Sequence, residues 1–518
     1  MSMSDTTISR RTLLAGACAA IAGAGLTTTT QATKAFALAD VAALNATDVT
    51  WTDEADVVVV GYGGAGAAAA IEAAKAGAKV IILEMLDIAG GSTIANGGFI
   101  MMGGTKLQEK FGLEDSVENF YNYMVAAAGA NASLEHIKVL CDASPALYDW
   151  CVECGMDFES GQCDTEHHLG GYNAGFSLGY SGNEMARDYA AVAFPVPRGH
   201  MPQPGSSGYD MFTALSNTVD GLGVDVRMGT PGKHLVVDEA GRVCGVIAEG
   251  PDGQVAIQAK RGVILTAGGF GNNADMVAEN YALLNPRGTL ITAAGNENGS
   301  GILMGQAIGA ATRGMGCFQI GTTVATLNDA LPHGIFVDEN ARRIVAEDEY
   351  NAFIGKALAM APSGTCYFII DDAYATEGTA IERYGEPLAT CETIDEIAPA
   401  VGLNAEVLAS TITFYNESAA QGFDREFGKD ARYLTPLEQG PFHVFAYGSD
   451  RCYIASCGGL KIDTEAHVID LDGNVIPGLY AAGRNAGTIY GWYMGSGSSM
   501  ADVLTFGCIA GRNAAAEK

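Results

Sequence analysis

The chain has 518 residues, which is too long for one ordinary hydrophobic core, so we expect two domains. It contains 29 lysines and arginines against 60 aspartates and glutamates, and the formal net charge is −31. This acidity excludes nucleic-acid binding and binding to an anionic membrane, because a surface that binds phosphate must be basic.

The first 37 residues have the order of a secretory signal peptide. Arg10 and Arg11 form a twin-arginine pair, a run of small apolar residues follows, and Ala35–Ala37 has the A-x-A pattern of a cleavage site. We therefore expect residues 1–37 to direct export by the twin-arginine route, to the periplasm or the cell-surface side of a bacterium. A disordered N-terminus that happens to contain two arginines is the alternative. No later stretch is long and apolar enough to span a bilayer, so we expect no membrane insertion of the mature chain.

A strand, a glycine-rich turn and a helix are expected next, near residues 56–75. The continuous apolar run Val57–Val60 is typical of a parallel strand buried on both faces. The turn has G-x-G-x-x-G spacing, and a second strand after the helix ends in an acid. Such glycines let a pyrophosphate approach a helix N-terminus, and the acid accepts hydrogen bonds from ribose hydroxyls. The segment therefore predicts a dinucleotide site, without distinguishing NAD from FAD, that contains Gly61, Gly63, Gly64, Gly66 and Glu84.

Four cysteines in the following segment raise the question of an iron–sulfur cluster: Cys141, Cys151, Cys154 and Cys163. Cys151 and Cys154 lie in an expected helix, where cysteine is usually a small core residue. We therefore expect no metal site, and a cluster on these residues is the alternative. Arg198 and His200 follow in a loop rich in proline and glycine, which either edges the mouth of the active site or forms a rigid surface turn.

Four motifs identify a family resemblance. On them the chain resembles, over essentially all of its mature length, flavoproteins of the fumarate reductase and 3-ketosteroid Δ1-dehydrogenase superfamily. The resemblance implies an α/β fold in which a Rossmann-like FAD-binding domain is interrupted by a smaller α+β capping domain with catalytic residues. We expect the FAD-binding domain at 50–315 and 441–518, and the capping domain at 316–440. The motifs are GGSTIANGG (Gly90–Gly98), LTAGGF (Leu265–Phe270), NENGSGILMGQAIGA (Asn296–Ala310) and PGLYAAGRNAG (Pro477–Gly487).

The resemblance also extends the expected cofactor site. In covalently flavinylated relatives a histidine stands where this chain has Ser92, so we expect non-covalent FAD. The serines that follow Gly497 are expected to donate hydrogen bonds to the flavin pyrimidine from a helix N-terminus. The residues added in this way are Gly91, Ser92, Thr93, Asn96, Gly97, Gly98, Ala267, Gly268, Gly483, Arg484, Ser498 and Ser499.

Departures from the fumarate reductase branch disfavour a dicarboxylate substrate. That branch is expected to carry an arginine where this chain has Tyr350 or Asn351, two histidines at Ile454 and Ala455, and a second arginine at Met494. A carboxylate in a water-poor pocket needs a paired charge. Fumarate is therefore not the expected substrate.

The ketosteroid branch matches better. It carries a tyrosine, a glycine four residues later and a helix that ends in TFG, and Tyr493, Gly497 and Thr505–Gly507 have this spacing. The resemblance implies that the Tyr493 hydroxyl and the Gly497 N–H hold a carbonyl oxygen and stabilise an enolate. A further tyrosine acts on the proton in that branch; Tyr350 lies one residue from its place, and Tyr490 is a second candidate.

We therefore expect an exported FAD-dependent CH–CH oxidoreductase that moves a hydride between flavin and a carbon next to an activated C=C bond. The expected substrate is an apolar small molecule, an enone of 3-ketosteroid type, and the expected partner is an external electron donor or acceptor. The direction of the reaction is open. One alternative is an exported reductase of another conjugated alkene, of urocanate, cinnamate or lactone type, which needs cationic or hydrogen-bonding pocket residues. The other is a non-catalytic flavin electron-transfer subunit.

Overall fold

The strand expected at Val57–Val60 is the inner part of β2 (Asp53–Val60), and all four valines are buried in the computed structural model. The signal peptide expected at 1–37 lies outside the described residues. None of the described helices is long and apolar enough to cross a membrane. The structure describes residues 41–165, 176–202, 207–281, 290–291, 297–322, 331–375, 385–448 and 452–518.

The largest sheet in the described ranges has nine strands and contains β2 near its middle. β2 is parallel to both of its neighbours, β3 and β11, so the turn that follows it opens at the carboxyl edge of parallel strands. The strands, in spatial order, are β1 (Leu44–Asn45), β9 (Gly232–Val237), β10 (Val243–Gly250), β11 (Gly253–Leu265), β2, β3 (Val80–Leu83) and β8 (Asp225–Arg227), with β22 (Val475–Ala481) on β11 and β21 (His467–Ile469) on β22.

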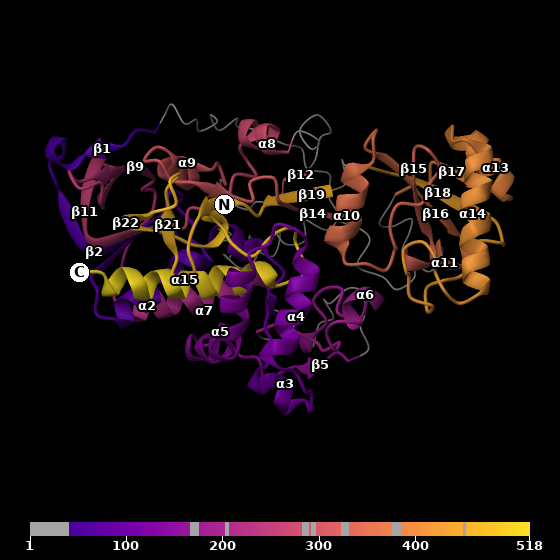
Figure 1. The fold of residues 1–518 in the computed structure, drawn as a ribbon, viewed down its shortest axis with the longest axis horizontal. Helices are drawn as coiled ribbons and strands as arrows, with labels where there is room; N and C mark the ends of the chain where they lie inside the picture. The colour runs from indigo at the N-terminus through magenta and orange to yellow at the C-terminus, as the bar shows by residue number, and fades with distance from the viewer. Residues whose placement is uncertain are drawn as a thin grey trace, which may run out of the picture. The chain divides into compact units, whose positions relative to one another are not determined.

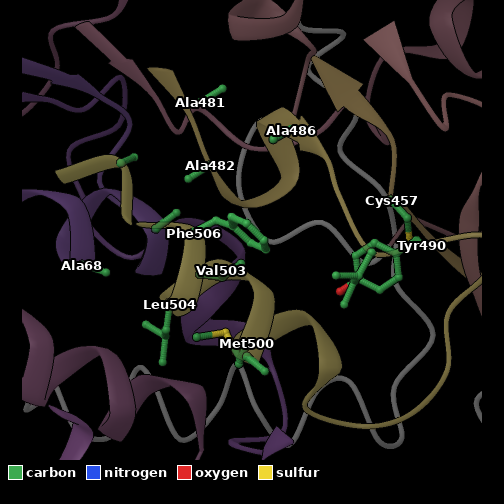
Figure 2. Close-up of a cluster of buried hydrophobic side chains, with 14 of the residues drawn as sticks. Ala68, Cys457, Ala481, Ala482, Ala486, Tyr490, Met500, Val503, Leu504 and Phe506 are labelled. Carbon is green, nitrogen blue, oxygen red and sulfur yellow. The ribbon is translucent and has the colours of Figure 1, made fainter. Parts of the chain in front are cut away.

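The last helix, α15 (Ser498–Ala516), returns the chain to its first strand–turn–helix. It packs along α2 (Gly64–Lys75), and Figure 1 shows the two helices together, α15 in yellow. The approach is close because small residues meet: a Cβ on Gly511 would lie 2.2 Å from the Ala69 carbonyl oxygen. Figure 2 shows the larger side chains of α15, among them Leu504 and Phe506, in the buried cluster that also contains Ala68 of α2.

A mostly helical region follows the glycine-rich turn. This region contains the Arg198 loop. The Arg198 side chain is fully buried and forms an ion pair with Asp115, with 2.9 Å between Nε and Oδ2. His200 is also buried, and burial lowers its pKa to about 4. Both belong to the core rather than to an active-site mouth. The elements here are β4 (Ile100–Met101), α3 (Lys106–Lys110), α4 (Val117–Ala128), α5 (Leu134–Glu153), β5 (Gln162–Cys163), β6 (Phe176–Gly179), α6 (Arg187–Ala190), β7 (Gly199–His200) and α7 (Gly208–Gly221).

The cysteines of this region have different neighbours. Cys151 interacts with Cys154 and Cys508, whereas Cys141 interacts with Arg198 and Asp115. Burial raises the pKa of the Cys151 thiol well above its ordinary value, as expected for a small core residue of a helix. Among the described residues, no group of three or more His, Cys, Asp or Glu side chains could hold a metal ion.

The segment from about residue 318 to 456, with the short strand β12 before it, forms separate small sheets. The antiparallel order β15-β16-β18-β17 has its own apolar cluster with α13 and α14, while α10 packs on β14 of the sheet β12-β19-β14. The elements are β12 (Leu290–Ile291), β14 (Phe318–Thr322), β15 (Ile335–Asp338), α10 (Asn351–Met360), β16 (Thr365–Asp371), α11 (Asp372–Ala375), β17 (Ala389–Cys391), α13 (Ile394–Val401), α14 (Ala405–Ala420), β18 (Phe442–Gly448) and β19 (Cys452–Ser456).

Shorter elements join these sheets to the nine-stranded one. A further three-stranded sheet, β13-β20-β23, includes β23, the strand that directly precedes α15 in the chain. The exact borders of the predicted FAD-binding and capping domains stay predictions. The remaining elements are α8 (Ala274–Asn280), α9 (Ser300–Gln306), β13 (Thr312–Arg313), β20 (Gly459–Lys461), β23 (Ala486–Gly487) and the 3₁₀ turns η2 (Ala46–Asp48), η3 (Gly91–Ala95), η5 (Leu331–His333) and η7 (Gly483–Asn485).

Candidate active site

The turn between β2 and α2 requires glycine at two positions. Gly61 has a φ of +108°, and a Cβ there would lie 2.5 Å from the Thr266 carbonyl oxygen. Gly66, in the first turns of α2, would place a Cβ 2.0 Å from the Gly61 carbonyl oxygen. These close approaches hold the N-terminus of α2 against the ends of β2 and β11, where an anion can meet helix N–H groups.

Glu84, just after β3, braces the same turn. Its carboxylate accepts hydrogen bonds from the Tyr62 N–H at 2.8 Å and from the Leu86 N–H at 2.9 Å. Burial raises the pKa of this carboxyl group, and the backbone donors act against that rise. Glu84 therefore lines the cleft and fixes its shape, and the second lone pairs of its oxygens suit a ribose hydroxyl.

A cleft begins at this turn, and most predicted cofactor residues line it. Six predicted residues are not among the lining residues: Gly66, Asn96, Gly97, Gly98, Ser498 and Ser499. The predicted residues that do line the cleft are Gly61, Gly63, Gly64, Glu84, Gly91, Ser92, Thr93, Ala267, Gly268, Gly483 and Arg484.

Local hydrogen bonds explain why some of these six residues do not line the cleft. The Asn96 amide donates to the Thr93 carbonyl and accepts from the Gly98 N–H, both at 2.6 Å, so it serves its own turn. The Ser498 hydroxyl donates to the Gly495 carbonyl at 2.8 Å. Gly66 acts through helix packing instead of lining the cleft. Direct cofactor contacts of the six residues stay predictions.

Glu297 is a cleft residue that the sequence analysis missed. The Ser92 hydroxyl donates to its Oε1 at 2.5 Å, while its Oε2 has no hydrogen-bond partner among the described residues, although the side chain is only 5% exposed. An unpaired buried carboxylate oxygen is costly, so this atom is suited to accept from a hydroxyl or N–H of a bound group. The sequence could have identified this residue, because Glu297 lies in the third of the four family motifs.

These features fit FAD. Two required glycines shape the turn, an acid stands where a ribose is expected, and a buried acceptor faces the cleft further along. Ser92 offers a hydroxyl where covalently flavinylated relatives have histidine. When bound, FAD would supply the hydride chemistry.

Three tyrosines stack on one another, and two of them lie against Arg484. The ring centroids of Tyr490 and Tyr493 lie 5.9 Å apart with 11° between planes, and Tyr350 stacks on Tyr493 at 6.3 Å. Tyr490 is 3% exposed, and its hydroxyl has no hydrogen-bond partner among the described residues. Burial raises the pKa of Tyr490 well above its ordinary value, so this phenol is neutral. The structure thus brings together the three tyrosines that the sequence analysis singled out.

Tyr350 comes from the other side of the site. Its hydroxyl lies 3.1 Å from the Ser496 Oγ, and its N–H donates to the Asn183 Oδ1 at 2.7 Å. The chain just before it is fixed by a buried ion pair between Arg343 and Glu347, Nη2 to Oε2, at 2.7 Å. Tyr350 is therefore held by hydrogen bonds at both its backbone and its hydroxyl, although it lies one residue from the family pattern.

Gly497 immediately precedes α15. It has a φ of +84°, and a Cβ there would lie 2.6 Å from the Met101 nitrogen, so only glycine fits. Its carbonyl accepts from the Met101 N–H at 3.1 Å. No described residue accepts a hydrogen bond from its own buried N–H. A donor in this position at a helix N-terminus is suited to a carbonyl oxygen.

Arg484 joins the cleft to the tyrosines. Its Cζ lies 5.5 Å and 5.6 Å from the ring centroids of Tyr490 and Tyr493, and its Nη1 donates to the Cys457 Sγ at 2.8 Å. Burial opposes its charge, but the Cys457 sulfur and the two phenols outweigh that effect and raise the pKa of Arg484. The sequence analysis assigned Arg484 to the cofactor alone, whereas the structure also places it against two of the tyrosines.

Asp502 was also missed, because it lies in the mostly apolar sequence of α15. It is fully buried, and its Oδ1 accepts from the Thr488 hydroxyl at 2.6 Å while Oδ2 has no partner among the described residues. Burial raises the pKa of Asp502 to about 7, and the Thr488 hydrogen bond and Arg484 limit that rise. Such shifted acids are concentrated at functional sites.

Comparison with known proteins decides the family. A family model described as FAD binding domain matches residues 56–500. The chain is 32% identical over 487 residues to urocanate reductase of Eggerthella lenta, covering 90% of this chain and 75% of the relative. The chain belongs to the FAD-dependent fumarate reductase and ketosteroid dehydrogenase superfamily.

Solved structures of this superfamily extend the match. The crystal structure of 3-ketosteroid-Δ4-(5α)-dehydrogenase from Rhodococcus jostii RHA1, in complex with 4-androstene-3,17-dione, is similar with a TM-score of 0.83 and 35% identity, covering 92% of this chain and 99% of that one. A flavocytochrome c3 fumarate reductase is similar with a TM-score of 0.67 and 27% identity, covering 91% and 80%. The ketosteroid enzyme is the better structural match of these two.

The comparisons confirm three predictions. The fold class is a Rossmann-like FAD-binding domain interrupted by a smaller α+β domain, the cofactor is FAD, and the protein is an FAD-dependent CH–CH oxidoreductase. The alternative of a non-catalytic electron-transfer subunit has no support.

Proposed function

We propose that the protein is an exported oxidoreductase of α,β-unsaturated ketones, with non-covalent FAD and an apolar, 3-ketosteroid-like enone as its substrate. The observation that carries the proposal is the pairing of a buried Gly497 N–H, for which no described residue is an acceptor, with Tyr493 four residues before it. An N–H and a phenol that converge on one oxygen stabilise negative charge without requiring a charged substrate. The similarity to a solved ketosteroid dehydrogenase supports this substrate class.

Each side chain then has a defined role. Tyr493 and Gly497 hold the carbonyl oxygen, on which negative charge develops as hydride joins or leaves the neighbouring carbon. Tyr350 exchanges the proton at the adjacent carbon, and the Ser496 hydroxyl, 3.1 Å away, orients it. Tyr490 packs against Tyr493 and excludes water from that side of the stack. An external electron donor or acceptor completes the cycle.

A reductase of a conjugated carboxylic acid is the second candidate, and Arg484 is the observation that favours it. This buried cation lies against Tyr490 and Tyr493, and a relative at 32% identity is a urocanate reductase. However, the guanidinium already donates to the Cys457 Sγ and to the Ser456 carbonyl, at 2.8 Å and 2.9 Å. Both donations come from Nη1, and Nη2 also donates to the Gln319 Oε1 at 3.4 Å, so the cation already has partners within the fold and the neutral enone ranks first.

Anaerobic reoxidation of the reduced, FAD-loaded protein distinguishes the enone reaction from reduction of a conjugated carboxylic acid. Flavin absorbance is followed after addition of a 4-en-3-one steroid, fumarate or urocanate in parallel. We expect rapid reoxidation by the steroid alone, and loss of that reaction in Y493F with FAD retained. Reoxidation by a carboxylic acid alone would overturn the enone proposal and favour Arg484 as the substrate anchor. If none of the three reacts, flavin reduction by the saturated 3-ketosteroid tests the opposite direction, and failure there also overturns the enone proposal.

Export is tested separately. In cells that express the full chain, R10K/R11K is expected to retain the protein in the cytoplasm, whereas the unmodified chain is exported and loses residues 1–37. N-terminal sequencing of the exported form locates the cleavage site. Equal export of both forms would overturn the twin-arginine assignment.

A further inference from the structure

Cys317 and Cys457 form a cross-strand pair beside the active site. β14 and β19 are antiparallel, with Phe318 opposite Ser456. One step beyond this ladder Cys317 stands opposite Cys457, and the Cys457 N–H donates to the Cys317 carbonyl at 2.9 Å. Directly opposed residues in an antiparallel pair have Cα atoms roughly 4.5–5.5 Å apart, within the range that a disulfide spans.

The two thiols are in different states. They share a hydrogen bond, and Cys457 also accepts from Arg484 Nη1 at 2.8 Å. Burial opposes a thiolate at Cys457, but the Cys317 thiol and the Arg484 guanidinium together lower its pKa to about 7. The same hydrogen bond and burial raise the pKa of Cys317. Cys457 is therefore the cysteine of the pair that ionises more readily, and Cys317 is the one that keeps its proton, as in a nucleophilic dithiol.

We propose that Cys317 and Cys457 are a redox-active pair that a small peroxide oxidises to a disulfide. The Cys457 thiolate attacks one peroxide oxygen and the O–O bond breaks, which gives a sulfenic acid at Cys457 and hydroxide. The Cys317 sulfur then attacks the Cys457 sulfur; the S–O bond breaks, and the Cys317 proton leaves with the hydroxyl as water. Together the two sulfurs lose two electrons to the peroxide, which leaves as one hydroxide and one water, and the hydroxide takes a proton from solvent, so the step balances.

Oxidation changes the charge of the active site. The Cys457 sulfur accepts from Arg484, so ionised Cys457 places a negative charge against the guanidinium, and in the disulfide that charge is gone. The guanidinium then keeps its hydrogen bond to the Ser456 carbonyl and its electrostatic interaction with Glu297, and Figure 2 shows Cys457 next to the Tyr490 ring. The pair thus sets the charge balance around Arg484, whichever substrate the enzyme takes.

Cys366 provides a matched control. It is also buried, and it interacts with a second buried cysteine, Cys452. Burial together with Asp338 and Glu339 raises the pKa of Cys366 to about 12, so it stays a thiol. A peroxide should therefore distinguish the two cysteine pairs by thiolate content, not by burial.

The test is peptide mapping of the FAD-loaded full chain after treatment with hydrogen peroxide. Remaining thiols are alkylated under denaturing conditions, and unreduced peptides are analysed by mass spectrometry. We expect a Cys317–Cys457 cross-linked peptide, reversible by dithiothreitol and unchanged in C366S. The proposal would be overturned if Cys317 and Cys457 both remained alkylatable while other cysteines were oxidised. A dominant cross-link between other cysteines would also overturn it.

Two variants test the chemistry. C317S should form no cross-link and should accumulate a sulfenic acid at Cys457 that dimedone traps. R484Q should slow formation of the cross-link about tenfold, because it removes the cation that favours the thiolate. C317S leaves the Arg484 contact intact, so it remains informative if R484Q does not fold. Absence of the dimedone adduct from C317S would contradict the assignment of Cys457 as the nucleophile.

Discussion

The rings of Tyr490 and Tyr493 lie nearly parallel, with centroids 5.9 Å apart, and the guanidinium of Arg484 is almost equally far from both. The two tyrosines belong to the short turn that precedes α15. That turn ends at Gly497, where only glycine fits. One stretch of eight residues therefore contains two stacked tyrosines and the glycine that precedes the last helix.

Replacement of Tyr493 by phenylalanine tests the carbonyl-binding role. Y493F keeps the ring stack but removes one of two donors to the developing negative charge, so turnover of an enone should fall roughly 100-fold to 1,000-fold. Flavin absorbance measures both turnover and FAD content. Y209F, at an exposed tyrosine of α7, is the control and should keep full activity. Equal turnover in Y493F and Y209F would remove Tyr493 from the mechanism.

Tyr350 and Ser496 are expected to act on the proton as a pair. Y350F removes the proton-transferring phenol, and the hydride and proton steps together should slow roughly 100-fold. S496A leaves the phenol but removes its hydrogen-bond partner, and about a fivefold loss is expected for one neutral hydrogen bond. Rapid-mixing measurement of substrate-dependent flavin reoxidation gives both values. A larger loss in S496A than in Y350F would show that Ser496, and not Tyr350, carries the proton.

Local sequence was enough to predict the dinucleotide fold, because its glycines meet backbone atoms close in sequence or in adjacent strands. Gly61 and Gly66 are required for this reason, and the motif showed it. Glu297, Cys457 and Asp502 were missed because their roles depend on long-range contacts. Glu297 meets Ser92 from 205 residues away, and no spacing rule predicts that distance. Arg484 was found but placed only with the cofactor, since its contact with the tyrosines depends on how the turn before α15 folds.

Glu297 is expected to strengthen FAD binding. The Oε2 of Glu297 has no partner among the described residues. E297Q keeps the shape of the side chain but puts a weaker acceptor or a donor in place of the carboxylate. The dissociation constant for FAD should rise about tenfold, which corresponds to about 1.4 kcal/mol. Fluorescence titration of the FAD-depleted protein measures it. The control is E279Q, on the exposed face of α8, and an equal constant in both variants would contradict the role.

Two helical glycines offer a matched pair for the packing argument. In G66A the new Cβ would lie 2.0 Å from the Gly61 carbonyl oxygen, whereas nothing lies within 4 Å of a Cβ at Gly221, the last residue of α7. G66A should lower the free energy of unfolding by about 3 kcal/mol or more, and G221A should raise it by about 0.5 kcal/mol. Urea denaturation followed by circular dichroism measures both changes. A stable G66A that still binds FAD would refute the steric requirement.

Asp502 should make stability depend on pH. Its pKa is about 7 in the folded protein against 3.8 for an ordinary aspartate, so the folded state retains a proton that the unfolded chain releases. The stabilising contribution is therefore complete below pH about 4 and is lost as pH rises through about 7. D502N cannot titrate and should lose less stability between these values. Glu349, whose pKa burial also raises to about 7, contributes in the same direction, so E349Q is the parallel variant. Urea unfolding at pH 5 and pH 8 with saturating FAD measures the change in the free energy of unfolding. An equal decrease of this free energy in D502N and in the unmodified protein would show that Asp502 does not hold the proton.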